Sequence, residues 1–242
     1  MNEIIKIFPT PFALAEALAF ELVNLVKKVE KREFPFTFAL SGGSTPRLLF
    51  SVLGDHFASS VKWDNTHIFW TDERCVPPDN TESNYRTAWK GFIERINIPE
   101  KNIHRIRGED DAVKESMRYS EEIAKFTRQR NGLPVFDFIM LGLGEDGHTA
   151  SIFPGNKTLF HSHRICEVTI HPVTDLKRIT LTGSVINNAE LITFLVTGKK
   201  KAEIIGEILG EKESAKRFPA SHIAPADGKL LWYLDRDAAT NI

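Results

Sequence analysis

The stretch Phe36–Leu53, FTFALSGGSTPRLLFSVL, consists of an apolar run, a glycine-rich turn and a second apolar run that follows a proline. The first run predicts a buried strand over Phe36–Leu40, because short apolar runs bounded by turn residues are typical of buried strands. Pro46 suits the first position of a helix, so the run after it predicts a helix. A strand that passes through a short turn into a helix indicates an α/β fold with a parallel sheet.

The turn Ser41–Arg47 predicts a phosphate site. Gly42 and Gly43 let the backbone approach a ligand closely, and Ser44 or Thr45 can cap the helix that follows. The unpaired N–H groups and the positive end of the helix dipole attract an anion. The turn lacks the lysine of a P-loop, so it does not indicate a nucleoside triphosphate. An ordinary capped turn is the simpler alternative.

Strand and helix patterns alternate along the rest of the chain. Apolar residues recur every three or four positions from Leu14, which predicts a helix that ends near Lys31. Other helices are predicted at Tyr85–Ile96, Asp110–Arg130 and in the sequence AEIIGEIL after Lys201. Other strands are predicted at Ile4–Phe8, His67–Thr71, Phe136 onward, Ile165–Val168, Arg178–Thr182, Ala189–Val196 and Leu230–Leu234. With 242 residues, we expect a single α/β domain over residues 1–242.

Three charged residues, Asp72, Glu73 and Arg74, follow the strand predicted at His67–Thr71. The carboxyl ends of parallel strands line the binding crevice of an open α/β sheet. These charges therefore fall where a site is expected. A solvated charged turn is the alternative.

The stretch Phe136–Gly155, FDFIMLGLGEDGHTASIFPG, contains the spacing G-x-G-x-x-G after a predicted strand. This spacing occurs in dinucleotide-binding turns, in which the last glycine opens a long helix that holds the pyrophosphate. Pro154 leaves room for about two helical turns at most. Glu145 and Asp146 would also place negative charge beside the pyrophosphate. Both observations argue against a dinucleotide site.

His148 lies two residues after Asp146 in the same turn, and it is the candidate catalytic group. An imidazole beside a carboxylate is suited to general acid–base catalysis near neutral pH. The alternative is a structural histidine that binds a backbone carbonyl. His161, His163 and His171 lack acidic or cysteine partners at metal-ligand spacing, so we expect surface or loop positions and no metal site.

Lys199, Lys200 and Lys201 follow Thr197-Gly198 at the start of a predicted helix. Positive charges there oppose the helix dipole unless an anion binds between them. The lysines therefore give a second indication of a phosphate, independent of the glycine-rich turn. A solvated lysine run is the alternative.

Composition excludes several classes of function. The formal net charge of −1 offers no general field that would attract nucleic acid or an anionic membrane. No apolar run reaches the roughly 20 residues that span a bilayer, and the first residues do not have the pattern of a signal peptide. We expect a cytoplasmic protein in which Cys75 and Cys166 are free thiols.

Six motifs, in this order, resemble those of the 6-phosphogluconolactonases: SGGSTPRLLF, WTDERCVPPDNTESNYRTA, LGLGEDGHTASIFPG, RITLT, VTGKKKA and FPASHIAP. The resemblance covers nearly the whole chain. It implies a Rossmann-like three-layer α/β sandwich, no cofactor, and hydrolysis of 6-phospho-D-glucono-1,5-lactone to 6-phospho-D-gluconate in the oxidative pentose phosphate pathway. The small-molecule partner is then a sugar-phosphate lactone, and the chain is a monomer or a homodimer.

The resemblance also implies roles for particular residues. The family's catalytic residues fall on His148, Asp146, Asp72 and Arg74. Its phosphate pocket falls on Gly42, Gly43, Ser44, Thr45, Arg178 and Lys201. Arg178 is assigned by the resemblance alone.

Two other functions compete with lactone hydrolysis. The glucosamine-6-phosphate deaminase/isomerases resemble the chain at the same strand ends, but they carry a glutamate five residues after the histidine. Phe153 occupies that position here, so the proton-relay acid of ring opening is missing. A sugar-phosphate sensor without catalysis would keep the glycine-rich turn and Lys201 but would not need Asp146 and His148.

Overall fold

The computed structural model describes residues 3–29 and 32–242. Within these ranges a large sheet of six strands has the order β1-β11-β10-β7-β2-β3, and each pair of neighbours is parallel. The strands are β1 (Glu3–Phe8), β2 (Phe36–Leu40), β3 (Thr66–Trp70), β7 (Phe138–Leu141), β10 (Leu191–Val196) and β11 (Lys229–Asp235). Every residue of β2 and β7 is buried, so the core is centred on these strands.

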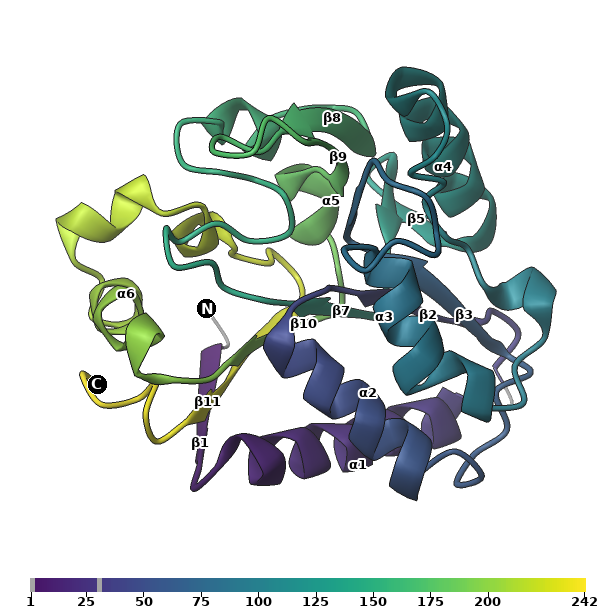
Figure 1. The fold of residues 1–242 in the computed structure, drawn as a ribbon, viewed down its shortest axis with the longest axis horizontal. Helices are drawn as coiled ribbons and strands as arrows, with labels where there is room; N and C mark the ends of the chain where they lie inside the picture. The colour runs from purple at the N-terminus through teal and green to yellow at the C-terminus, as the bar shows by residue number, and fades with distance from the viewer. Residues whose placement is uncertain (1–2, 30–31) are drawn as a thin grey trace.

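Helices cover both faces of the large sheet. Figure 1 shows α1 and α2 on one face, and α4 and α5 with a small sheet on the other. The helices are α1 (Pro11–Val29), α2 (Ser44–His56), α3 (Asn84–Gly91), α4 (Ala112–Phe126), α5 (Gly183–Ile186) and α6 (Ala202–Leu209). This arrangement confirms the predicted three-layer α/β fold with a mostly parallel sheet.

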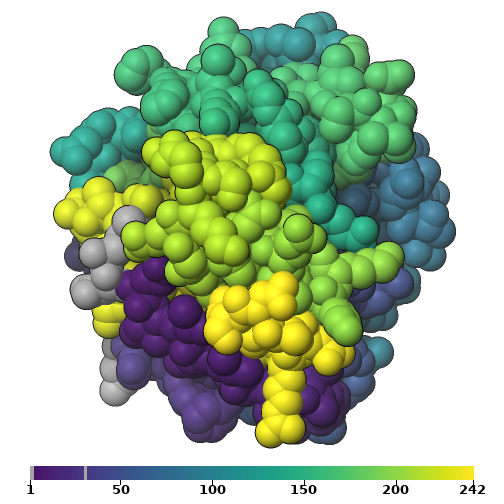
Figure 2. Space-filling view, turned by 90° about the vertical axis from the view of Figure 1, so that its left-hand side faces the viewer, coloured from purple at the N-terminus to yellow at the C-terminus, as the bar shows by residue number. Residues whose placement is uncertain are grey.

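The first helix buries the apolar stripe that predicted it. Leu14, Leu18 and Leu22 are each at most 1% exposed and pack on the sheet. The helix is described to Val29, and its predicted end near Lys31 lies outside the described residues. On the surface, β1 lies beside the C-terminal segment, as the purple and yellow atoms in Figure 2 show. Within the described ranges, no helix has the length and apolarity needed to cross a bilayer.

The small sheet corrects one prediction. Asp72–Arg74, expected only as the charged end of the strand His67–Thr71, forms a separate strand, β4, which pairs antiparallel with β9 (Lys177–Leu181) and through it with β8 (Cys166–Ile170). The chain leaves the large sheet at Thr71, whose carbonyl accepts a hydrogen bond from the N–H of Leu181 (2.7 Å). Residues 72–74 stay extended because β9 provides them with a new pairing partner.

Two predicted helices are too long. The helix expected over Tyr85–Ile96 is α3, which ends at Gly91. The helix expected over Asp110–Arg130 is α4, which ends at Phe126. Residues after α4 form a hairpin of β5 (Arg128–Arg130) and β6 (Leu133–Val135). Asn131 and Gly132, with φ of 55° and 76°, make its two-residue turn, which matches the Asn-Gly preference of tight hairpins.

Candidate active site

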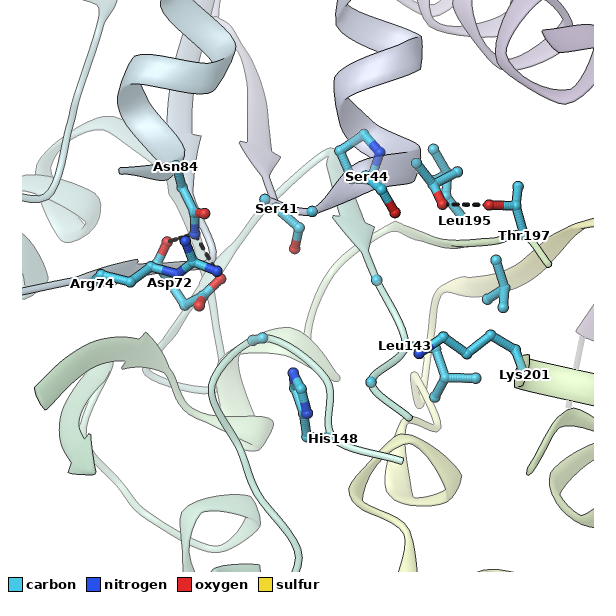
Figure 3. Close-up of a pocket in the computed structure, with 18 of the residues that line it drawn as sticks. Ser41, Ser44, Asp72, Arg74, Asn84, Leu143, His148, Leu195, Thr197 and Lys201 are labelled. Carbon is cyan, nitrogen blue, oxygen red and sulfur yellow. Dashed lines mark hydrogen bonds between the residues drawn. The ribbon is translucent and has the colours of Figure 1, made fainter. Parts of the chain in front are cut away.

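A cavity lies where the carboxyl ends of β2, β3, β7 and β10 meet (Figure 3). His148 enters it from the turn after β7 (Figure 3). Asp72, Arg74 and Asn84 lie on one side of His148, and Ser44, Thr197 and Lys201 lie on the other (Figure 3). Of the residues singled out from the sequence, the cavity is lined by Gly42, Gly43, Ser44, Thr45, Asp72, Arg74, His148, Arg178 and Lys201. Asp146 is not in the lining but contacts His148 directly.

The glycine-rich turn presents free backbone N–H groups to the cavity. Gly43, with φ of 115°, is the N-cap of α2, and no side chain caps this helix in the described structure. The capping role predicted for Ser44 or Thr45 is therefore wrong, because only glycine readily adopts this φ. Pro46 is the third helical residue, where the first was predicted. Helix geometry leaves the N–H groups of Ser44 and Thr45 without intrahelical partners.

A hydroxyl pair fixes this turn to the end of β10. Thr45 Oγ1 lies 2.8 Å from Thr197 Oγ1, so one hydroxyl donates to the other. The bond joins the start of α2 to the segment that leads to Lys201. The helix N-terminus and this lysine are thereby presented to the same cavity.

Strand β4 alternates between the cavity and the protein interior. Asp72 and Arg74 line the cavity, whereas Glu73 between them is 2% exposed. Asp72 is itself held by protein groups, because its Oδ2 accepts a hydrogen bond from the Ser151 hydroxyl (2.6 Å). Arg178 Nη1 lies 3.9 Å from the same carboxylate oxygen.

Arg74 and Arg178 are directly opposite each other in the register of β4 and β9. Like charges placed opposite each other destabilise an antiparallel pair. The Nε atoms of both residues are buried and have no hydrogen-bond partner among the described residues. Burial lowers the pKa of Arg178, and the nearby Arg74 charge acts in the same direction while Asp72 opposes it. Two guanidinium groups so arranged are suited to an anionic or oxygen-rich ligand.

Asp146 and His148 form a hydrogen-bonded pair. His148 Nδ1 lies 2.5 Å from Asp146 Oδ1, and the backbone N–H of His148 donates to the same oxygen (3.1 Å). Partial burial raises the pKa of Asp146, but the hydrogen bond and charge of His148 outweigh it and lower the pKa to about 2. The carboxylate is therefore ionised near neutral pH, which fixes the Nδ1 proton of His148 and leaves Nε2 as the basic atom.

Gly144 is required for this geometry. A Cβ atom on Gly144 would lie 2.1 Å from His148 Nδ1 and 2.5 Å from Asp146 Oδ1. The backbone N–H of Gly144 also donates to the carbonyl of His148 (2.8 Å), which closes the turn. In the described structure no α-helix follows between Gly147 and Ile165, so the glycine spacing does not open the helix that a dinucleotide site needs.

Lys201 is the lysine of the predicted cluster that lines the cavity, whereas Lys199 and Lys200 are exposed. It ends the short 3-10 helix Lys199–Lys201 that precedes α6. Burial lowers the pKa of Lys201, and the charges of Glu145 and Asp146 oppose that shift.

Two contacts at the site were not predicted from the sequence. The Asn84 side chain lines the cavity, and its Nδ2 donates to the carbonyl of Asp72 (2.9 Å). Ser151 donates to the Asp72 carboxylate from the interior. Ser151 lies in the stretch Phe136–Gly155, but its contact with Asp72 joins segments that are distant in the sequence, so the sequence does not indicate it.

Phe153 is 3% exposed, and its ring centroid lies 4.9 Å from that of His148. An apolar ring therefore occupies this side of the imidazole. Within the described residues, no group of three or more His, Cys, Asp or Glu is placed to hold a metal ion. Both cysteines, Cys75 and Cys166, are free thiols, as predicted.

The fold and cavity define an α/β protein with a polar site, lined by arginine, lysine and histidine, at the carboxyl ends of its strands, and comparison with known proteins identifies its family. Residues 9–232 match the model of the glucosamine-6-phosphate isomerases/6-phosphogluconolactonase family, and the chain belongs to this family.

Two relatives of this chain are named 6-phosphogluconolactonase. The chain is 40% identical over 232 residues to the 6-phosphogluconolactonase of Haemophilus influenzae, with 96% of each protein covered. It is 38% identical to the 6-phosphogluconolactonase of Synechocystis, with 95% of this chain and 93% of the relative covered.

Solved structures of related proteins have the same fold as this chain. The structure of 6-phosphogluconolactonase from Trypanosoma brucei superposes with a TM-score of 0.89 at 28% identity, and covers 99% of this chain and 98% of its own. A monomeric glucosamine-6-phosphate deaminase has a TM-score of 0.83 at 22% identity, with 99% of this chain and all of its own covered, which shows a shared fold.

Proposed function

We propose that this protein hydrolyses 6-phospho-D-glucono-1,5-lactone to 6-phospho-D-gluconate, the lactonase step of the oxidative pentose phosphate pathway. The observation that carries the proposal is the Asp146–His148 pair, with a 2.5 Å hydrogen bond, at a cavity that also contains a free helix N-terminus and cationic side chains. The 40% identity to relatives named 6-phosphogluconolactonase supports the same reaction.

In the proposed mechanism His148 acts as the general base. Its Nδ1–H is held by Asp146, so Nε2 takes a proton from water as the water oxygen attacks the lactone carbonyl carbon. His148 then returns the proton to the ring oxygen as the carbon–oxygen bond breaks, and the carboxylic acid product leaves. Asp146 stabilises the imidazolium that forms between these steps.

Two kinds of donor are available for the developing oxyanion: the Arg74 guanidinium and backbone N–H groups. Removal of one such donor in other enzymes costs about 3 to 4 kcal/mol of transition-state stabilisation. The Arg74 Nε–H is buried at the cavity without a partner in the described structure, which supports this role. Asp72, which Ser151 holds in place, is proposed to offset the positive charges of Arg74 and Arg178.

The substrate phosphate is proposed to bind away from the reacting carbon, on the backbone of Gly42, Gly43, Ser44 and Thr45 and on the side chains of Arg178 and Lys201. The free N–H groups of the α2 N-terminus and the partly buried Lys201 ammonium support this assignment. Binding energy from a remote phosphate then serves to orient the lactone towards His148.

The competing functions are less well supported. A deaminase or isomerase of the sister type needs a carboxylate at the position of Phe153, which is a buried ring here. A sensor would not need a carboxylate–imidazole pair with one imidazole nitrogen left free.

Other parts of the proposal concern the whole protein. A single domain over residues 1–242, a cytoplasmic location, and a monomer or homodimer remain predictions. So does the expectation that the chain needs no cofactor and binds no nucleic acid or membrane.

The test is a pair of assays on the purified protein. Acid release from freshly prepared 6-phosphogluconolactone, corrected for spontaneous hydrolysis, is measured beside ammonia release from glucosamine 6-phosphate. We expect turnover of the lactone alone. Ammonia release would identify a deaminase, and binding of sugar phosphate without turnover of either substrate would identify a sensor.

A further inference from the structure

Glu73 is a buried carboxylate that the proposed mechanism does not use. It lies in β4 between Asp72 and Arg74 and is 2% exposed. Within the described part of the chain it forms no ion pair with lysine, arginine or histidine. A buried charge without a counter-ion is costly unless hydrogen bonds satisfy it, so its partners explain why it is tolerated.

Four donors satisfy this carboxylate. Oε1 accepts from the backbone N–H groups of Arg74 and Asn84, both at 2.8 Å. Oε2 accepts from the N–H of Tyr85 (2.8 Å) and the hydroxyl of Ser83 (2.9 Å). Burial raises the pKa of Glu73, and these hydrogen bonds oppose that shift. Three of the donors belong to the N-terminus of α3, where the helix dipole also favours a negative charge.

The carboxylate therefore joins two walls of the cavity. One is β4, from which Arg74 enters, and the other is the start of α3, from which Asn84 enters. Asn84 donates from Nδ2 to the carbonyl of Asp72 (2.9 Å), and its Oδ1 lies 1.8 Å from where a Cβ on Gly42 would stand. The positions of β4, α3 and the glycine-rich turn are thus set by one another.

The position of the Arg74 side chain depends on this contact between β4 and α3. Its guanidinium donates from Nη1 to the carbonyl of Glu82, in the loop that leads into α3, and its Nε is buried without a partner in the described structure. It also faces the like charge of Arg178 across the strand pair. The like charge of Arg178 tends to displace this guanidinium, and Glu73 resists the displacement because its carboxylate binds the backbone N–H of Arg74.

We propose that Glu73 is a positioning residue that fixes the Arg74 guanidinium at the cavity by binding β4 to the N-terminus of α3. The proposal rests on the proposed function, in which Arg74 contacts the reacting lactone. A purely structural role, in which Glu73 only caps α3, would stabilise the fold without an effect that passes through Arg74.

A double-mutant cycle on the full chain separates the two roles. Glu73→Gln keeps the size of the side chain but removes its charge and turns one acceptor into a donor. We expect it to lower kcat/KM for 6-phosphogluconolactone at least tenfold in the native background and less than twofold in an Arg74→Ala background. Equal losses in both backgrounds would overturn the proposal. If Glu73→Gln does not fold, Glu73→Asp, which keeps the charge, is measured in the same two backgrounds with the same criterion.

Thr87→Val is the matched control. The Thr87 hydroxyl donates to the carbonyl of Ser83 at the start of α3 (3.0 Å), so its loss weakens the same helix end without removing any of the four donors to Glu73. We expect a lower Tm and kcat/KM within twofold of the native value. A loss of activity equal to that of Glu73→Gln would assign the effect to the helix end and contradict the proposal.

A second readout does not depend on activity. In protein labelled with ¹⁵N-arginine, the Nε–H signal of Arg74 is identified by its absence in Arg74→Lys, and its exchange with solvent is measured. We expect exchange at least tenfold faster in Glu73→Gln and unchanged in Thr87→Val. Equal protection in Glu73→Gln and the native protein would refute the positioning role. If exchange is faster in Glu73→Gln than in the native protein, but the native protein does not hydrolyse the lactone, the proposed function alone is rejected.

Discussion

Acid sensitivity is expected from a buried histidine pair on the side of the sheet covered by α4. His104 Nε2 lies 2.8 Å from His67 Nδ1, and His104 Nδ1 lies 2.7 Å from Glu122 Oε1. The second contact places a proton on His104 Nδ1, so Nε2 accepts a hydrogen bond from His67. Protonation of His104 at Nε2 would place two N–H groups against each other and break this chain of hydrogen bonds.

The structure gives the size of the effect. The His104 side chain is 2% exposed, and burial, with the nearby charges of Arg118 and Lys125, lowers its pKa from 6.5 to about 4. Because the folded-state pKa lies below the unfolded-state value, the stabilisation is present above pH 6.5 and is lost as the pH falls towards the folded-state pKa. The linkage relation gives a loss of about 2 kcal/mol from His104 between about pH 7.5 and about pH 5.

The measurement is the free energy of unfolding in urea at these two pH values for the native protein and for His104→Gln, whose amide can replace both hydrogen bonds. We expect the native protein to lose about 2 kcal/mol more than the variant over this interval. His163→Gln, which changes an exposed histidine, is the control and should follow the native protein. Equal losses in the native protein and His104→Gln would refute the reasoning.

Two further predictions concern the site. Gly144→Ala forces the His148 ring away from its position, and we expect kcat/KM to fall about a hundredfold with the fold retained by circular dichroism. Gly142→Ala, where the added Cβ meets its nearest atom at 3.8 Å, should lose much less, and equal losses would reject the steric argument. Lys201→Ala should raise KM for the phosphorylated lactone at least tenfold and leave that for unphosphorylated gluconolactone within twofold, whereas Lys200→Ala should change neither. An equal rise for both lactones would contradict a phosphate contact.

Much of the fold could be predicted because its signals are local. The buried strand Phe36–Leu40 and the helix after it are set by an apolar run, a turn and a helical stripe, each readable within about 20 residues. The hairpin after α4 also has a local signal, Asn131-Gly132, which lies directly after the helix predicted over Asp110–Arg130. Strand β4 had none, since its pairing partner Arg178 lies more than 100 positions beyond Arg74.

The candidate site shows the same division. The ends of the predicted strands indicated where polar groups converge. The turn residues Gly43 and His148 both line the cavity there. The sequence did not identify Asn84 or the Ser151–Asp72 hydrogen bond, because these contacts form between segments that only the tertiary structure brings together. It also placed the helix cap at Ser44 or Thr45, one or two residues after the observed N-cap Gly43, because the φ of Gly43 is not visible in the residue order.

The most direct test of the proposed function is the turnover of 6-phosphogluconolactone by His148→Ala beside the native protein, with spontaneous hydrolysis subtracted. If His148 is the general base, kcat falls about a hundredfold or more while the fold is unchanged. An unchanged kcat in the folded variant would contradict the central claim that His148 activates the attacking water.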